Sequence, residues 1–151
     1  MSDEPETDMD INVFRPDRPG IRKVLGDLES DIMEFIWDRP PDEETTVREV
    51  FEALYQRRRI AYTTVMNTMA RLARKRLLVV EKKDQAYSYR AAFSQDEFIS
   101  RFVGRILESL LVSFTGPTIA GLNALADPET AGRARSLLDE IERRRAAEEK
   151  P

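Results

Sequence analysis

Apolar residues recur at the three- and four-residue intervals of a helix in three successive segments. These segments predict helices at residues 27 to about 37, 46 to 56 and 62 to 75. Asp27 is the expected N-cap of the first helix, and Thr45 or Thr46 that of the second. After Arg76 the pattern becomes extended, with two β-prone runs on either side of Lys82-Lys83-Asp84-Gln85. Three helices followed by a hairpin predict a winged helix-turn-helix.

A helical module is predicted from Ser94 to about Ala147, where Ser94 and Glu97 form a capping box. Gly116-Pro117 should interrupt the module, and Asp127-Pro128 should begin its last helix. The module has too few residues to cover its own apolar surface, so we expect it to form a homodimer. An intramolecular clamp over the winged helix and a groove for a small-molecule effector are alternatives. The expected interface residues are Ile99, Phe102, Val103, Ile106, Leu107, Leu110, Leu111, Ile119, Leu122, Leu125, Leu137, Leu138 and Ile141.

The fold class expected from these patterns is mainly α with a small β-hairpin. The N-terminal segment is rich in Asp, Glu, Pro and Arg and predicts a disordered leader. In an alternative interpretation, Arg15, Arg18, Arg22 and Lys23 form an arm that enters a DNA minor groove. The expected parts are the leader (1–24), the winged helix-turn-helix (25–92) and the C-terminal helical dimerisation module (93–147).

Composition argues against catalysis and against metal sensing. The 151 residues include neither Cys nor His, so a zinc site or a Ser-His or Cys-His nucleophile cannot be built from this chain. We expect no enzyme activity, no metal and no cofactor. The acidic N-terminus lacks an apolar stretch, and no apolar run approaches the roughly 20 residues of a membrane span. A cytoplasmic protein without stable membrane association is therefore expected.

Charge is distributed unevenly along the chain. Residues 45–90 contain eleven Lys or Arg against four Asp or Glu, a net +7, whereas the whole chain is −4. This asymmetry favours double-stranded DNA as a partner of the central segment. Side chains expected to contact the DNA backbone are Thr46, Arg48, Tyr62, Arg71, Arg74, Lys75, Lys82 and Lys83.

One face of the third helix carries residue types that read base edges. The apolar stripe of this helix is Val65, Met69 and Leu72, which we expect in the core. The opposite face begins with Thr63, Thr64 and Asn67 and contains no acidic residue. Short polar side chains can approach base edges closely, so these three are the expected base contacts. Helix capping is the alternative role for Thr63.

The segments GDLESDIMEFIW, TVREVFEAL, AYTTVMNTMARLARKRLLVVEKKDQAYSYRA and SQDEF closely resemble the penicillinase repressor family of bacterial transcriptional regulators. The resemblance is close over about residues 25–98. It implies a homodimeric repressor on an inverted-repeat operator that controls genes of β-lactam resistance, copper handling or other stress responses. It also implies base contacts from Thr63, Thr64 and Asn67, with Arg71 toward the backbone.

Two departures from the family pattern leave the inducing signal open. Copper-responsive members bind metal through Cys, which this chain lacks. In the β-lactam branch a membrane sensor metalloprotease cuts at an Asn-Phe pair; here Asn123 is followed by Ala124. A membrane sensor metalloprotease remains a further candidate partner. Its cleavage of this chain would relieve repression through loss of dimerisation. The competing interpretations are a winged helix that binds protein, and an architectural DNA binder without sequence preference.

Overall fold

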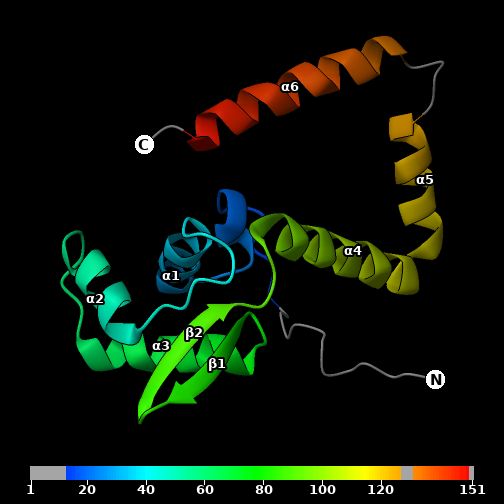
Figure 1. The fold of residues 1–151 in the computed structure, drawn as a ribbon. Coiled ribbons are helices and arrows are strands. Elements are labelled where there is room, and N and C mark those ends of the chain that lie inside the picture. The colour runs from blue at the N-terminus through cyan, green and yellow to red at the C-terminus, as the bar shows by residue number, and fades with distance from the viewer. Residues whose placement is uncertain (1–12, 127–130, 150–151) are drawn as a thin grey trace, which may run out of the picture. The chain divides into compact units, whose positions relative to one another are not determined.

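The computed structural model describes residues 13–126 and 131–149, and the chain divides into two compact units, Met1–Ile99 and Ser100–Pro151. In the first unit a 3-10 helix, Gly20–Lys23, is followed by α1 (Asp27–Trp37), α2 (Val47–Tyr55), α3 (Tyr62–Arg74), β1 (Leu78–Lys83) and β2 (Ala86–Ala91). Figure 1 shows three helices followed by an antiparallel hairpin. The predicted fold class, mainly α with a small hairpin, is confirmed.

The core of the first unit is built where the apolar stripes of these elements meet. Its buried side chains include Ile32, Met33 and Ile36 of α1, Val50 and Leu54 of α2, Val65, Met69 and Leu72 of α3, and Leu77 and Leu78 at the start of the hairpin. Burying each such side chain stabilises the fold by about 1.5–3 kcal/mol. Phe98 closes this core against Trp37, with ring centroids 5.5 Å apart, and the Trp37 indole N–H donates to the Phe93 carbonyl.

The N-cap predicted from the sequence is correct for α2 and wrong for α1. Thr46 is the N-cap of α2, as predicted, and its hydroxyl accepts a hydrogen bond from the Glu49 amide at 3.2 Å. The prediction that Asp27 caps α1 is wrong. The N-cap is Gly26, whose amide donates to the Glu29 carboxylate at 3.1 Å, and Asp27 is the first helical residue.

Residues in the left-handed backbone region form the turn between α3 and the hairpin and the turn within the hairpin. Arg76 follows α3 in the left-handed region (φ 68°), and the Leu77 amide donates to the Leu72 carbonyl, which closes the last helical turn. At the hairpin tip Asp84 (φ 50°) and Gln85 (φ 68°) are both left-handed. Two such residues make a type I′ turn, whose twist suits a two-residue hairpin. A bridge between Thr45 and Tyr89 attaches β2 to the segment before α2.

The N-terminal segment differs from the expected leader where the structure describes it. Residues 1–12 lie outside the described residues. Beyond them, Gly20–Lys23 forms a 3-10 helix, and Val24 and Leu25 are buried. Arg18 and Arg22 bind carboxylates of α1 instead of projecting as an arm. The reason is local charge: α1 presents acidic side chains beside this basic segment.

The C-terminal helices are α4 (Gln95–Ser113), which begins in the first unit, α5 (Thr115–Ala126) and α6 (Ala131–Glu149). The predicted capping box is confirmed, because the Ser94 hydroxyl accepts from the Glu97 amide and Glu97 accepts from the Ser94 amide. The predicted break at Gly116-Pro117 is wrong by two residues: the helix bends at Phe114, and Pro117 lies in the first turn of α5. Proline is tolerated there because those amides lack helical partners. Asp127-Pro128 lies outside the described residues.

Candidate nucleic-acid interface

The exposed face of α3 carries the predicted base-contact residues. With about 3.6 residues per turn, Thr63, Thr64 and Asn67 lie on the side opposite the buried Val65 and Met69. All three predicted side chains are exposed. The same face continues to Arg71 and Arg74 at the C-terminal end of the helix, and both arginines are exposed. The structure thus brings a polar, acid-free helix surface and two cations onto one side.

Helix capping does not account for the threonines of α3. The N-cap is Ala61, which offers no side-chain cap, so Thr63 and Thr64 lie inside the first helical turn. The one buried threonine of this helix is Thr68, whose hydroxyl donates to the Thr64 carbonyl at 2.7 Å. Thr63 and Thr64, in contrast, are exposed.

At the N-terminal end of α3, two of the residues predicted to contact the DNA backbone pack against each other. The Arg48 guanidinium of α2 lies over the Tyr62 ring, 5.8 Å from its centroid, and the ring also packs edge-on against Phe51. Stacking on an aromatic face holds Arg48 near the first turn of α3. Thr46 is different, because its hydroxyl caps α2.

At the other end of α3, two of the residues predicted to contact the DNA backbone form ion pairs with a buried carboxylate. Lys75 Nζ lies 2.8 Å from Glu29 Oε2, and an Arg71 guanidinium nitrogen lies 4.0 Å from the same oxygen. The Glu29 side chain is only 10% exposed. Burial opposes its ionisation, but hydrogen bonds from Lys75 and the Gly26 amide outweigh burial and lower the pKa of Glu29. DNA phosphate would have to share these cations with Glu29.

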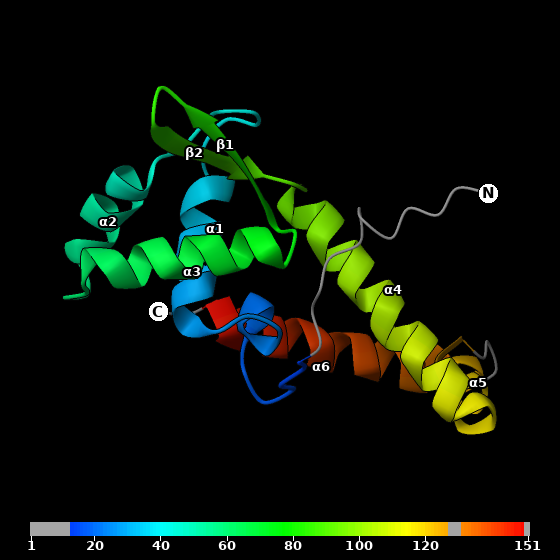
Figure 2. The ribbon, with the colours of Figure 1, turned by 90° about the horizontal axis from the view of Figure 1, so that it is seen from below.

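The wing is the β1–β2 hairpin, which contacts α3 through β1, and Figures 1 and 2 show the two side by side. Lys82 and Lys83 lie at the end of β1, next to the turn, and both are exposed. Lys83 Nζ donates to Glu44 at 2.8 Å, and Glu44 also accepts from the Ser88 hydroxyl. These bonds raise the pKa of Lys83 and lower that of Glu44. Lys82 lies over the Tyr87 ring at 5.7 Å.

Sequence reasoning missed the carboxylates that hold these cations. Glu29 lies 46 residues before Lys75, and Glu44 lies 39 residues before Lys83. No local spacing connects residues so far apart. The one available signal was the position of Glu29 three residues after Gly26, which is typical of a capping box. Within the described residues, no group of acidic side chains is arranged to hold a metal ion.

The predicted dimer residues form a largely uncovered apolar surface in the single chain. Three of them (Phe102, Ile106, Leu111) are half-buried, and the others are exposed by 37% or more: Ile99, Val103, Leu107, Leu110, Ile119, Leu122, Leu125, Leu137, Leu138 and Ile141. Within the described residues, no helix is long and apolar enough to cross a membrane.

The family model described as Penicillinase repressor matches residues 25–140, from the first winged-helix residues into α6. The chain belongs to the penicillinase repressor family. Two curated relatives, each named transcriptional regulator BlaI, come from Mycobacterium tuberculosis strains CDC 1551 / Oshkosh and ATCC 25618 / H37Rv. Each is 45% identical to this chain over 76 residues, half of this chain and 54% of the relative. The chain thus matches about half the length of these two curated relatives.

Proposed function

We propose that this chain is a sequence-specific DNA-binding transcriptional repressor that acts as a homodimer on an inverted-repeat operator. In this proposal α3 enters the major groove, where Thr63, Thr64 and Asn67 contact base edges. Arg71, Arg74 and the wing lysines contact phosphates on either side. The dimer places two such helices about one helical turn of DNA apart, as paired half-sites require.

The observation that carries the proposal is the composition of the exposed face of α3. Solvent-facing helix surfaces usually mix acids with Lys and Arg, whereas the first turns of α3 expose only short or neutral side chains. Carboxylates would repel phosphate, and long side chains would hold the helix away from the base edges. An architectural DNA binder would need mainly Lys and Arg on this face, and a protein-binding winged helix would have no need of flanking cations.

Dimerisation is supported by the apolar surface of the C-terminal helices. Leu110, Leu122 and Leu138 are each exposed by 41% or more in the single chain. Monomeric proteins rarely leave such an extended apolar surface in water. Joining two winged helices makes the second half-site contact intramolecular, which raises affinity by roughly 10²–10⁴. Any event that separates the protomers, including cleavage by a membrane metalloprotease, would therefore release the operator and relieve repression of stress-response or β-lactam-resistance genes.

Selection from a randomised duplex library tests this proposal directly. The full-length protein is used to enrich bound duplexes over several rounds, and the enriched pool is sequenced. We expect an inverted repeat whose half-site centres lie about 10 base pairs apart, or a multiple of that distance. A pool that stays random would reject sequence-specific binding, and a single unrepeated half-site would reject the dimer.

The matched control is the Thr64→Val, Asn67→Leu double variant, which keeps side-chain volume similar at two exposed positions and removes their hydrogen-bonding groups. It should still bind DNA through its cations but should not enrich the wild-type sequence. Enrichment of the same inverted repeat by this variant would show that α3 does not read the bases.

A further inference from the structure

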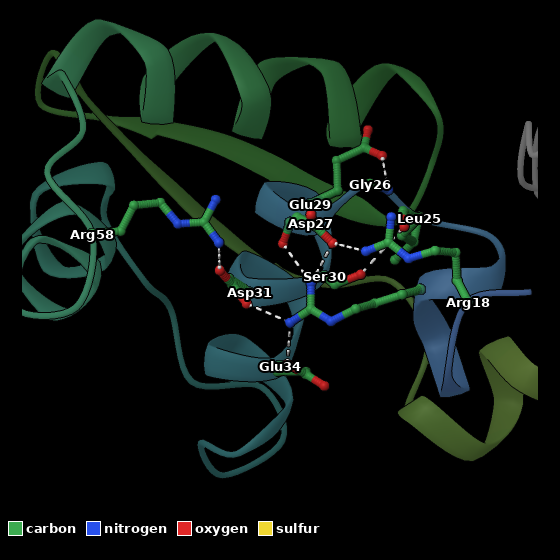
Figure 3. A network of polar contacts seen from close by, with 10 residues as sticks. Arg18, Leu25, Gly26, Asp27, Glu29, Ser30, Asp31, Glu34 and Arg58 are labelled. Atoms are coloured by element: carbon green, nitrogen blue, oxygen red, sulfur yellow. Dashed lines mark hydrogen bonds and ion pairs between the residues drawn. The ribbon is translucent and has the colours of Figure 1, made fainter. Parts of the chain in front are cut away.

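Asp31 of α1 lies between two arginines that come from distant parts of the chain. Its Oδ1 accepts from Arg22 at 2.7 Å, and its Oδ2 accepts from Arg58 at 2.6 Å. The Asp31 side chain is 9% exposed. Figure 3 shows Arg58 pointing toward Asp31. Because a buried carboxylate needs compensation on both oxygens, the two arginines are coupled through it.

The two arginines belong to segments with different roles. Arg58 lies in the loop between α2 and α3, which is the turn of the helix-turn-helix, and its amide donates to the Leu54 carbonyl. Arg22 belongs to the N-terminal 3-10 helix and also donates to the Asp27 carboxylate at 3.1 Å. Asp27 accepts a further bond from Arg18, visible in Figure 3. The N-terminal segment is thus linked through α1 to the turn that precedes the recognition helix.

Helix α3 is consequently fixed to α1 near both of its ends by buried carboxylates two positions apart. Glu29 holds Lys75 just after the C-terminal end, and Asp31 holds Arg58 just before the N-terminal end. Between these anchors α3 runs for about 20 Å, at 1.5 Å per residue. A small movement at either anchor would tilt the helix and displace Thr64 and Asn67 from base edges, which demand close hydrogen-bond geometry.

We propose that Arg22 and Asp31 are positioning residues for base readout: the N-terminal segment acts as a brace that fixes the turn before α3, and it does not contact DNA itself. This inference rests on the proposed DNA-binding function. With Arg22 in place, each Asp31 oxygen has its own guanidinium partner. Without it, the carboxylate is left with Arg58 alone, and it rotates toward solvent or draws Arg58 into a new position. Either response loosens the turn.

The test compares Arg22→Gln and Asp31→Asn with Arg15→Gln in the full chain. Arg15 lies in the same N-terminal segment, is exposed, and its side chain makes no hydrogen bond or ion pair with the described residues. Arg15→Gln therefore removes the same charge as Arg22→Gln without touching Asp31. Affinity is measured by fluorescence anisotropy for two probes, a duplex enriched from a random library by the wild-type protein and a scrambled duplex.

We expect Arg22→Gln and Asp31→Asn each to lower the preference for the enriched duplex by about 3-fold to 30-fold, the range typical of coupled networks. Binding to the scrambled duplex and the salt dependence should stay as in wild type, and Arg15→Gln should change neither. The double variant should lose no more than Asp31→Asn alone, because Arg22 acts on the turn before α3 through Asp31.

Other outcomes overturn the brace. If Arg22→Gln weakens both probes and reduces the salt dependence, and Arg15→Gln does the same, the segment is a DNA-binding arm. Additive losses in the double variant would show that Arg22 and Asp31 act separately.

Hydrogen exchange keeps the brace testable apart from DNA. The amides of Arg57 and Arg58 should exchange faster in Arg22→Gln than in the wild-type protein. In Arg15→Gln they should exchange at the wild-type rate. Unchanged exchange in both variants rejects the brace. If the amides exchange faster in Arg22→Gln but the wild-type protein prefers no duplex, the brace is a structural feature of the fold. The proposed DNA-binding function is then rejected.

Discussion

Replacing Asn67 by Ala removes a predicted base contact and leaves the fold intact. The side chain is exposed on α3 and makes no hydrogen bond or ion pair with the described residues. No internal partner is lost, and Ala favours a helix over Asn by about 0.5 kcal/mol. The thermal midpoint should therefore stay the same or rise slightly. Any loss of binding in this variant must come from the interface with DNA.

The size of the loss follows from the number of contacts. A good hydrogen-bonded pair between an amide side chain and adenine contributes about 1–3 kcal/mol of discrimination. A dimer presents two copies of Asn67, so the preferred duplex should lose about 2–6 kcal/mol, which is at least a roughly thirtyfold drop in affinity. A scrambled duplex, held mainly through phosphates, should lose almost nothing.

Competitive fluorescence anisotropy measures both affinities under the same buffer and salt. The expected result is a selective loss on the enriched duplex, with the scrambled duplex unchanged. An equal loss on both duplexes would make Asn67 a backbone contact, and no loss on either would place it outside the interface. Either result would refute the assignment of α3 as the base-reading helix.

Three further outcomes are expected. Lys82→Ala should weaken the enriched and scrambled duplexes by the same factor and make the salt slope shallower, because a phosphate contact carries no base information; a selective loss would contradict this. Leu107→Asp should give a monomer in sedimentation analysis with greatly weakened operator binding, whereas Ser109→Asp, on the same helix, should stay dimeric; a dimeric Leu107→Asp variant would refute the assigned interface. Glu29→Gln should lower the free energy of unfolding by about 1 kcal/mol at neutral pH. Because the pKa of Glu29 is lowered in the fold, its contribution is complete above the ordinary carboxyl range and is lost as the pH falls through the lowered value. Urea unfolding should thus show the two proteins converging at acid pH, and a gap that persists there would contradict the ion-pair explanation.

The sequence predicted those parts of the fold that depend on local patterns. Helical periodicity placed Val65, Met69 and Leu72 in the core, and the Ser94 capping box was correct. The start of α1 was misassigned because Gly26 and Asp27 are both acceptable caps, and the Asp27 carboxylate instead pairs with Arg18 and Arg22.

The residue types of the candidate interface could be predicted from the sequence. The ion pairs with carboxylates elsewhere in the chain could not. The exposed positions of Thr63, Thr64 and Asn67 follow from helical periodicity alone. The ion pairs of Lys75 with Glu29 and of Arg58 with Asp31 depend on tertiary packing of α1 against α3 and its preceding loop, across 46 and 27 residues of sequence. A basic segment near the N-terminus likewise has the same composition whether it binds DNA or α1.

The salt dependence of binding to the enriched duplex tests the proposed DNA recognition most directly. In the proposed complex Arg71, Arg74 and the wing lysines, Lys82 and Lys83, contact phosphates, so about four phosphates per protomer, or roughly eight per dimer, should be neutralised. Anisotropy titrations at a series of salt concentrations should then give saturation at two protomers per duplex. The slope of log affinity against log salt should be about −7. A slope near zero, or saturation at one protomer per duplex, would contradict a dimeric repressor that binds operator DNA through α3 and the wing.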